Sequence, residues 1–236
     1  MTESMPRWQQ IAATLARGFE ADRLAPGTRL PTEAQLAQRF DVNRHTIRRA
    51  IEALVRTGQV RVEQGRGAFI ADDLLDYEIA TRTRFSETIR RHNRVPEGRV
   101  LRLRTILATP PVAAALAIGE GEPVVLLERL GLADAIPVSL AEHHFPSDRL
   151  PGLEAAFRST ASITAALEAA GVVDYLRRST RVTTRMPTSA EADLLEMPRT
   201  RPLLVCENLN VDAADRPIEF TLTRHPGNRM QLVFEP

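Results

Sequence analysis

The chain has 236 residues, a formal net charge of +1 at pH 7 and a single cysteine, Cys206. This length is sufficient for two domains that each bury a core of their own. One cysteine excludes a framework of internal disulfides, and no apolar run is long enough to span a membrane. Because the N-terminus also lacks a signal-peptide pattern, we expect a cytoplasmic protein without membrane attachment.

The charges are distributed unevenly along the chain. Residues 1–71 contain 11 Arg and 7 acidic residues, whereas residues 72–236 contain 20 Arg and 23 acidic residues. Positive charge concentrated in one segment can neutralise phosphates, which makes binding to nucleic acid strong and salt-dependent. The first segment is therefore the candidate partner of a nucleic acid.

Two helices are predicted before residue 41. The first covers residues 7–23, where apolar side chains recur every three or four positions, as is typical of a face buried in a core. The second begins after Thr32, whose hydroxyl can form a capping box with Gln35, and it ends near Phe40.

A tight turn over residues 41–43 leads to a third predicted helix, which Asn43 can cap and which ends at Gly58. One face of this helix is apolar and is expected to be buried. The rest of its first two turns is basic, with Arg44, His45, Arg48 and Arg49. A recognition helix uses this end to reach base edges in the major groove of DNA.

A small hairpin is predicted directly after the third helix. Two short strands, residues 60–62 and 68–70, are joined by a loop in which Arg66 lies between Gly65 and Gly67. The glycines permit a tight turn close to a phosphate backbone, and the Arg supplies charge at its tip. A solvated charged helix beside an ordinary hairpin is the alternative, but the combined features favour a winged helix-turn-helix that binds DNA.

Residues 6–71 resemble the N-terminal domain of the GntR family of bacterial transcription regulators. The resemblance rests on residues 25–33, 36–40, 42–50 and 65–67. It implies contacts with DNA from the recognition helix, from the wing and from one phosphate-binding side chain. These residues are Arg29, Asn43, Arg44, His45, Thr46, Arg48, Gln64, Gly65 and Arg66. Ala34 stands where many members have Arg or Lys, so one contact common in the family is expected to be missing.

Residues 72–82 are acidic and are predicted to form a linker that lets the DNA-binding domain, residues 1–71, swing. Residues 83–236 predict a second domain of mixed α+β class. Its predicted helices are residues 86–92, 110–116, 162–170 and 188–196. Its predicted strands are residues 99–108, 124–133, 136–145, 176–186, 203–212, 217–224 and 232–234. Strands and short helices in this order indicate one antiparallel sheet with helices packed against it.

The sequence favours neither a metal site nor an enzyme. His143 and His144, with Glu142 and Asp148 nearby, are possible metal ligands, but adjacent strand residues point to opposite faces and do not easily share one ion. No nucleophile–base pair or carboxylate pair stands out. We therefore expect neither a metal, nor a cofactor, nor catalytic residues.

The second domain resembles the effector domain, called UTRA, of the HutC subfamily within the GntR family, which shares a fold with chorismate lyase. The resemblance rests on residues 84–87, 121–124, 128–129, 136–137, 145–146 and 162–163, together with Glu219 and Arg229. Residues 39–51 and 84–86 are most similar to the PhnF-type regulators of phosphonate utilisation. The quartet Asn-Arg-His-Thr at residues 43–46 is the specific part, because other subfamilies usually have Ser-Arg there.

In the subfamily an anionic metabolite binds on the sheet and changes the affinity for DNA. The resemblance implies these effector-binding residues: Arg84, Arg129, Ser162, Thr164, Glu219 and His225. Guanidinium groups and hydroxyls suit a phosphate or phosphonate. Gly131 stands where relatives that bind amino-sugar phosphates have a second Arg, which weakens that assignment. From spacing alone, Arg129 can equally be a surface charge paired with Glu128 or Glu142.

We therefore expect a homodimeric transcription regulator, a repressor, that binds a palindromic operator and responds to a small anionic effector. A phosphonate or phosphate ester is the expected effector, and genes of phosphonate uptake and degradation are the expected targets. A sugar phosphate or a histidine-pathway acid is the alternative effector. A chorismate lyase-like enzyme is the distant alternative, because likeness of fold does not carry activity.

Overall fold

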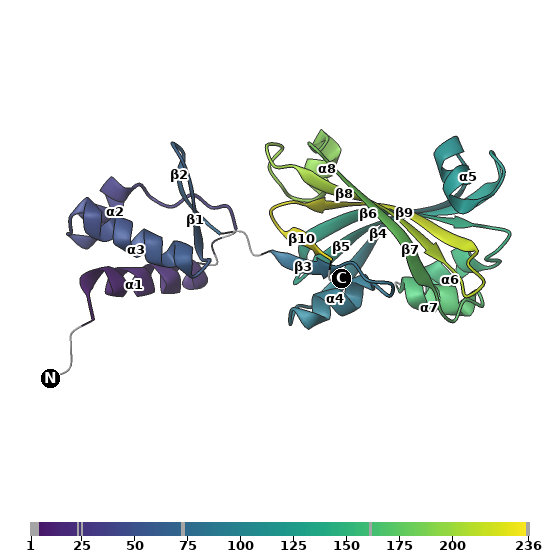
Figure 1. Cartoon of the computed structure of the whole chain (residues 1–236), viewed down its shortest axis with the longest axis horizontal. Coiled ribbons are helices and arrows are strands. Elements are labelled where there is room, and N and C mark those ends of the chain that lie inside the picture. Colours follow the sequence, from purple (N-terminus) through teal and green to yellow (C-terminus); the bar gives the residue numbers. More distant parts are fainter. Residues whose placement is uncertain (1–4, 23, 25, 72–73, 161, 235–236) are drawn as a thin grey trace. The chain divides into compact units, whose positions relative to one another are not determined.

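The computed structural model describes residues 5–22, 24, 26–71, 74–160 and 162–234. The chain forms two compact units, Met1–Asp73 and Leu74–Pro236, and Figure 1 shows the elements of each. The predicted class is confirmed: a winged helix-turn-helix is followed by a unit of mixed helices and antiparallel sheet. Among the described residues, no helix has the length and apolar character needed to cross a membrane.

The first unit consists of three helices and a hairpin. Its elements are α1 (Arg7–Ala21), α2 (Glu33–Phe40), α3 (Arg44–Arg56), β1 (Val60–Glu63) and β2 (Gly67–Ile70). The first helix is shorter than the predicted range 7–23, and residue 23 lies outside the described residues. Apolar side chains of all five elements form one core, in which Leu36 and Ile47 are fully buried.

The helix ends of this unit follow from local sequence. Thr32 and Gln35 form the predicted capping box, and this places the start of α2. Asp41 adopts the left-handed conformation (φ 50°) that ends α2 and turns the chain. The Asn43 side chain then accepts a hydrogen bond from the Thr46 backbone N–H (2.8 Å), which caps α3 as predicted.

The second unit contains the remaining strands and helices. Its strands are β3 (Leu75–Glu78), β4 (Pro96–Leu107), β5 (Pro123–Ala133), β6 (Ile136–Pro146), β7 (Leu176–Arg185), β8 (Leu203–Val211), β9 (Pro217–Pro226) and β10 (Met230–Val233). Its helices are α4 (Phe85–Arg91), α5 (Pro110–Leu116), α6 (Leu153–Ser159), α7 (Ile163–Ala169) and α8 (Ser189–Leu194). Helix α6 was not predicted; the other elements lie within a few residues of their predicted ranges, except β3.

Six strands form an antiparallel sheet in the order β4-β5-β6-β9-β8-β7. The predicted hairpin of β5 and β6 is present, with Asp134 (φ 50°) and Ala135 (φ 65°) in its two-residue turn. Figure 1 shows α4, α6 and α7 on one side of the sheet and α5 and α8 on the other. Each side has its own apolar cluster, so the sheet is covered on both faces.

Part of the segment predicted to be a linker, residues 72–82, is a strand, β3. It pairs in parallel with β10, and its side chains Leu75 and Tyr77 are buried. The linker prediction is therefore wrong for residues 75–78, which belong to the second unit, while residues 72–73 lie outside the described residues. The acidic composition suggested solvent exposure, but it could not show that a partner strand exists at the far end of the chain.

Candidate functional sites

The exposed face of α3 carries the basic side chains that the sequence analysis assigns to DNA. Arg44 and His45 are exposed in the first turn of α3. Neither side chain has a hydrogen-bond or ion-pair partner within the part of the chain that the structure describes. Both are therefore available to an external acceptor such as a base edge or a phosphate oxygen.

Two other arginines of α3 already have partners within the first unit. Arg48 donates to both carboxylate oxygens of Glu33, with Nε–Oε1 and Nη2–Oε2 distances of 3.2 and 2.9 Å. The Arg49 guanidinium lies over the Trp8 ring at 5.1 Å from the ring centroid. Arg48 therefore has to exchange a carboxylate for a phosphate or base before it can bind DNA, whereas Arg44 does not.

Asn43 and Thr46 are joined by hydrogen bonds. The Asn43 Oδ1 accepts from the backbone N–H and from the hydroxyl of Thr46, at 2.8 and 2.9 Å. These two residues of the predicted DNA-binding set thus hold the start of α3 in place. The amide N–H₂ group of Asn43 remains available to an external acceptor.

The wing residues Gln64, Gly65 and Arg66 are exposed at the tip of the β1–β2 hairpin. Arg66 pairs with Glu63 at 2.5 Å, and its guanidinium also lies near the Phe69 ring.

Arg29 reaches the same hairpin. It forms an isolated bridge with Phe69, and a side-chain carbon at Gly67 would lie 3.3 Å from the Arg29 Nε. The structure thus brings Arg29 beside β2 of the wing, with its guanidinium near Gly67, although Arg29 lies more than 30 positions earlier in the chain.

A polar cavity of about 490 Å³ lies in the second unit, on the sheet face that α4 and α7 cover. Its floor consists of alternate residues of β5, β6, β9 and β8, and its walls come from β3, the start of α4 and the start of α7. All six residues of the predicted effector site line it: Arg84, Arg129, Ser162, Thr164, Glu219 and His225. Residues from the start of α4, from β5, from the start of α7 and from β9 thus meet in one place.

Arg129 is the cavity group most suited to an anion. Within the described residues, its guanidinium has neither a hydrogen-bond acceptor nor an ion pair. Burial lowers its pKa, although a guanidinium still stays protonated at neutral pH. The alternative pairing with Glu128 or Glu142 is not observed, because Glu128 pairs with Arg102 (3.4 Å) and Glu142 with Arg224 (2.6 Å).

Arg84 is held at the cavity wall by an aromatic ring. Its guanidinium carbon lies 3.6 Å from the centroid of the Tyr175 ring, and its Nη2 donates to the Tyr175 carbonyl at 3.1 Å. Asp174 lies 3.9 Å away. This stacking orients the guanidinium while several of its N–H groups remain available.

Glu219 is the buried acid of the cavity, and both of its carboxylate oxygens accept hydrogen bonds from neighbouring side chains. Its Oε1 accepts from His143 Nδ1 at 2.6 Å, and its Oε2 accepts from the Asn210 amide. Burial alone would raise the pKa of the Glu219 carboxyl, but these hydrogen bonds hold it below its ordinary value. Glu219 therefore organises the floor of the cavity.

His225 is a neutral ring at the other end of the floor. Burial lowers its pKa to about 4, and its Nδ1–H donates to the Val138 carbonyl at 3.0 Å. Its Nε2 is then an acceptor. The Tyr77 ring of β3 lies 5.4 Å from it, centroid to centroid, so the strand missed by the sequence analysis forms part of this site.

Ser162 and Thr164 line the cavity at the start of α7. The Ser162 hydroxyl accepts from the Ala165 backbone N–H at 3.2 Å and caps the start of the helix. The Thr164 hydroxyl lies 3.5 Å from the Tyr175 hydroxyl.

Arg177 is a cavity residue that the sequence analysis missed. Its Nε and Nη1 donate to Asn210 and Asn208, both at 2.9 Å. A shift of register between Arg177 and Ser179 breaks the alternation of β7 at this point. No sequence signal marks such a bulge, so the face on which Arg177 lies could not be read from the alternation.

The two adjacent histidines of β6 face opposite sides of the sheet, as the alternation predicts. His143 lines the cavity, whereas the His144 ring lies beside the Phe220 ring in the apolar cluster under α5. Among the described residues, no group of three or more His, Cys, Asp or Glu is arranged to hold a metal ion.

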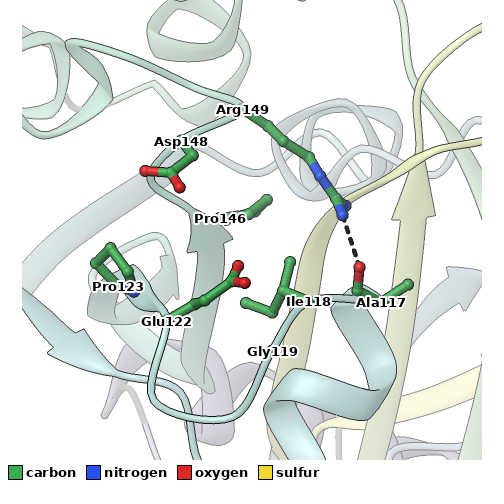
Figure 2. Close-up of a pocket in the computed structure, with 8 residues that line it drawn as sticks. All are labelled: Ala117, Ile118, Gly119, Glu122, Pro123, Pro146, Asp148 and Arg149. Atoms are coloured by element: carbon green, nitrogen blue, oxygen red, sulfur yellow. Dashed lines mark hydrogen bonds between the residues drawn. The ribbon is translucent and has the colours of Figure 1, made fainter.

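A second, more open cavity of about 350 Å³ lies at the end of α5. Figure 2 shows its basic side chain, Arg149, directed at the Ala117 carbonyl. Arg149 donates to the carbonyls of Leu116 and Pro217 as well, at 2.7–2.8 Å in each case. Helix α5 ends at Ala117, which is in the left-handed conformation, and the Arg149 guanidinium donates to the free carbonyls at this helix end. We therefore assign Arg149 a structural role.

The cavity with Arg84 and Arg129 thus has the chemistry of an anion site. It combines guanidinium groups with hydroxyls of both side walls, and its buried carboxylate, Glu219, is already hydrogen-bonded. Such groups recognise a phosphate, phosphonate or carboxylate.

Each of the two units matches a known protein family or domain. Residues 7–70 match the model of the bacterial regulatory proteins of the gntR family, and residues 91–231 match the UTRA domain. The chain is 34% identical over 231 residues to a protein of Escherichia coli K12 described as "Probable transcriptional regulator PhnF", covering 97% of this chain and 95% of that one. It is 29% identical over 219 residues to the HTH-type transcriptional repressor PhnF of Mycolicibacterium smegmatis, covering 91% and 88%.

The fold is similar to that of one solved structure over nearly the whole length of both chains. The crystal structure of PhnF from Mycobacterium smegmatis has a TM-score of 0.66 and 25% sequence identity, and the likeness covers 96% of this chain and 98% of that one.

Proposed function

This chain is a transcriptional regulator of the GntR family, of the PhnF-like type with a UTRA domain, and we propose that a small anionic metabolite in the polar cavity controls its affinity for operator DNA. The observation that carries the proposal is the Arg129 guanidinium, which lies in the cavity without a hydrogen-bond acceptor or an ion pair among the described residues, while the charge of Glu219 acts on it from beyond ion-pair distance. Placing an unpaired cation in a partly buried site is costly unless a ligand compensates it.

The cavity supports an anionic ligand. Its lining carries four arginines, Arg84, Arg90, Arg129 and Arg177, against three glutamates, Glu87, Glu97 and Glu219. The excess charge is positive, which favours an anion. We propose a phosphonate or phosphate ester as the effector, with genes of phosphonate uptake and degradation as targets. A volume of about 490 Å³ also admits a sugar phosphate, which is the second candidate.

DNA would be bound by the exposed face of α3 together with the wing. We propose that two copies bind the half-sites of a palindromic operator as a homodimer, with repression as the outcome. The effector would shift the balance between two arrangements of the protein, by no more than its difference in affinity for the two.

The test uses an operator selected by the full-length protein from random DNA duplexes. Binding is followed by fluorescence anisotropy while methylphosphonate, 2-aminoethylphosphonate, glucosamine 6-phosphate or urocanate is added. We expect a phosphonate to change the operator affinity of the wild type and to have no effect on Arg129→Ala, which should still bind the operator.

Arg104→Ala is the matched control, since it removes an exposed Arg from β4 and should respond like the wild type. An unaltered response of Arg129→Ala would refute the cavity as the effector site. A response to glucosamine 6-phosphate or urocanate alone would replace the phosphonate assignment. Turnover of a carboxylate substrate, together with no selected DNA, would favour an enzyme.

A further inference from the structure

Two glycines face each other on neighbouring strands at the edge of the effector cavity. Gly98 of β4 is paired in register with Gly131 of β5, and both line the cavity. Two positions further along, Val100 is paired with Arg129. Because paired residues of an antiparallel sheet share a face, Arg129 and Gly98 are diagonal neighbours on the cavity face.

The Arg129 side chain lies across the backbone of Gly98. A side-chain carbon at Gly98 would be 2.7 Å from the Arg129 Cζ and 3.1 Å from its Nε, and closer still to its Nη2. Separations under about 3 Å between such atoms do not persist in proteins. The observed position of the guanidinium therefore exists only because residue 98 has no side chain.

The paired glycine gives a contrast on the same wall. The atoms nearest to a side-chain carbon at Gly131 would be those of Phe85, at 2.7 Å from its Cζ, and the Ser139 hydroxyl. At Gly98 the three nearest atoms all belong to Arg129. Each glycine thus leaves room for a different cavity residue, and Gly98 leaves it for the arginine that has no hydrogen bond or ion pair among the described residues.

We propose that Gly98 is a positioning residue for the effector: its bare backbone fixes where the Arg129 guanidinium meets the anion. This inference rests on the proposed anion site in the cavity. A guanidinium binds an oxyanion through N–H groups in a fixed fork, so a displacement of about 1 Å misaligns both hydrogen bonds. A residue without charge or donor would in this way control the affinity for the anion.

Alanine at position 98 is a mild change for the fold. The backbone of Gly98 lies outside the left-handed region, so an L-residue is tolerated there. The atoms that the added methyl group meets belong to the far end of a flexible side chain. Gly98→Ala should therefore move the guanidinium and leave the sheet intact.

The experiment is a double-mutant cycle on the full-length protein, titrated with methylphosphonate by isothermal titration calorimetry up to millimolar concentrations. It compares the wild type with Gly98→Ala, Arg129→Ala and the double variant. Gly18→Ala, whose added carbon meets nothing within 4 Å, is the control for a Gly→Ala change. Circular dichroism verifies that each variant is folded.

We expect Gly98→Ala to bind methylphosphonate roughly tenfold more weakly than the wild type, and Arg129→Ala to bind it at least as weakly. The double variant should bind no more weakly than Arg129→Ala, because Gly98 acts only through the guanidinium. A merely structural role would instead weaken binding by the same factor in both backgrounds, and that result would overturn the inference.

The remaining outcomes separate this inference from the proposed function. If Gly98→Ala binds like the wild type while Arg129→Ala does not, the inference is wrong and the anion site stands. If Arg129→Ala binds like the wild type, the anion site fails and the role of Gly98 fails with it. The same holds if the wild type binds neither methylphosphonate nor, in parallel titrations, glucosamine 6-phosphate or urocanate.

Discussion

The two units use arginine in opposite ways. In the first unit, the candidate DNA contacts lie on exposed surface, and all but Arg29 come from two short stretches, residues 43–48 and 64–66. In the second unit, the candidate effector residues come from distant parts of the chain and meet in a cavity. An exposed arginine is hydrated and can exchange partners, whereas a buried one depends on the neighbours that the fold provides.

This difference predicts which property of the protein a substitution changes. Changes in the cavity should alter the stability of the second unit or its response to an anion. Changes on α3 should alter DNA binding and leave stability almost unchanged. The single tryptophan, Trp8, belongs to the core of the first unit, so its fluorescence reports that unit separately.

Glu219→Ala should have the largest effect on stability. The substitution leaves His143 and the Asn210 amide without their buried acceptor, which costs about 3 kcal/mol. In urea unfolding, the circular dichroism transition of the second unit should move to lower urea, while the Trp8 fluorescence transition should stay in place. Glu207→Ala, an exposed acid on β8, is the control. Equal stability of the two variants would contradict the buried network.

The ion pair on the other sheet face should make stability depend on pH. Hydrogen bonds from Arg185 and Thr188 lower the pKa of the Glu191 carboxyl to about 2, against an ordinary value of 4.5. A lowered folded-state pKa stabilises the fold above pH 4.5, and this contribution is lost as the pH falls toward 2. This contribution of the Glu191 charge to the free energy of unfolding is on the order of 2 kcal/mol.

Urea unfolding of the wild type and of Glu191→Gln, measured from pH 7 to pH 2, checks this dependence. We expect the difference in unfolding free energy between them to shrink below pH 4.5. A difference that is the same at every pH would show that the charge of Glu191 does not stabilise the fold.

Arg44→Ala should weaken binding to the selected operator by roughly 30-fold, or about 2 kcal/mol, since a base contact by Arg is worth that much. A mobility-shift titration measures the change. Arg17→Ala, which removes an exposed Arg from α1, should bind within about threefold of the wild type. Unchanged binding by Arg44→Ala would refute α3 as the recognition helix.

Glu33→Gln should have the smallest effect. It releases Arg48 from its exposed carboxylate partner, so binding to DNA should become stronger by no more than about threefold at low salt. The same titration, repeated at higher salt, should show a steeper salt dependence than that of the wild type. Weaker binding would mean that Glu33 orients Arg48 toward DNA instead of competing for it.

Local sequence patterns specify the first unit in detail. The capping box of Thr32 and Gln35, the cap at Asn43 and the apolar stripe of α3 are local signals, and the structure has each of them. The predicted antiparallel sheet of the second unit is also confirmed, because alternating side chains and turn residues are local as well. The family resemblance selected six effector residues, and all of them line one cavity.

The way in which distant parts of the second unit meet depends on long-range packing and could not be predicted from local patterns. The pairing of β3 with β10 turned part of a predicted linker into a buried strand, because a parallel partner leaves no mark in the local sequence. The bulge of β7 placed Arg177 beside Asn208, and the bare backbone of Gly98 placed the Arg129 guanidinium. Local patterns predict which elements form, whereas the contacts of a buried charge depend on packing between elements far apart in the chain.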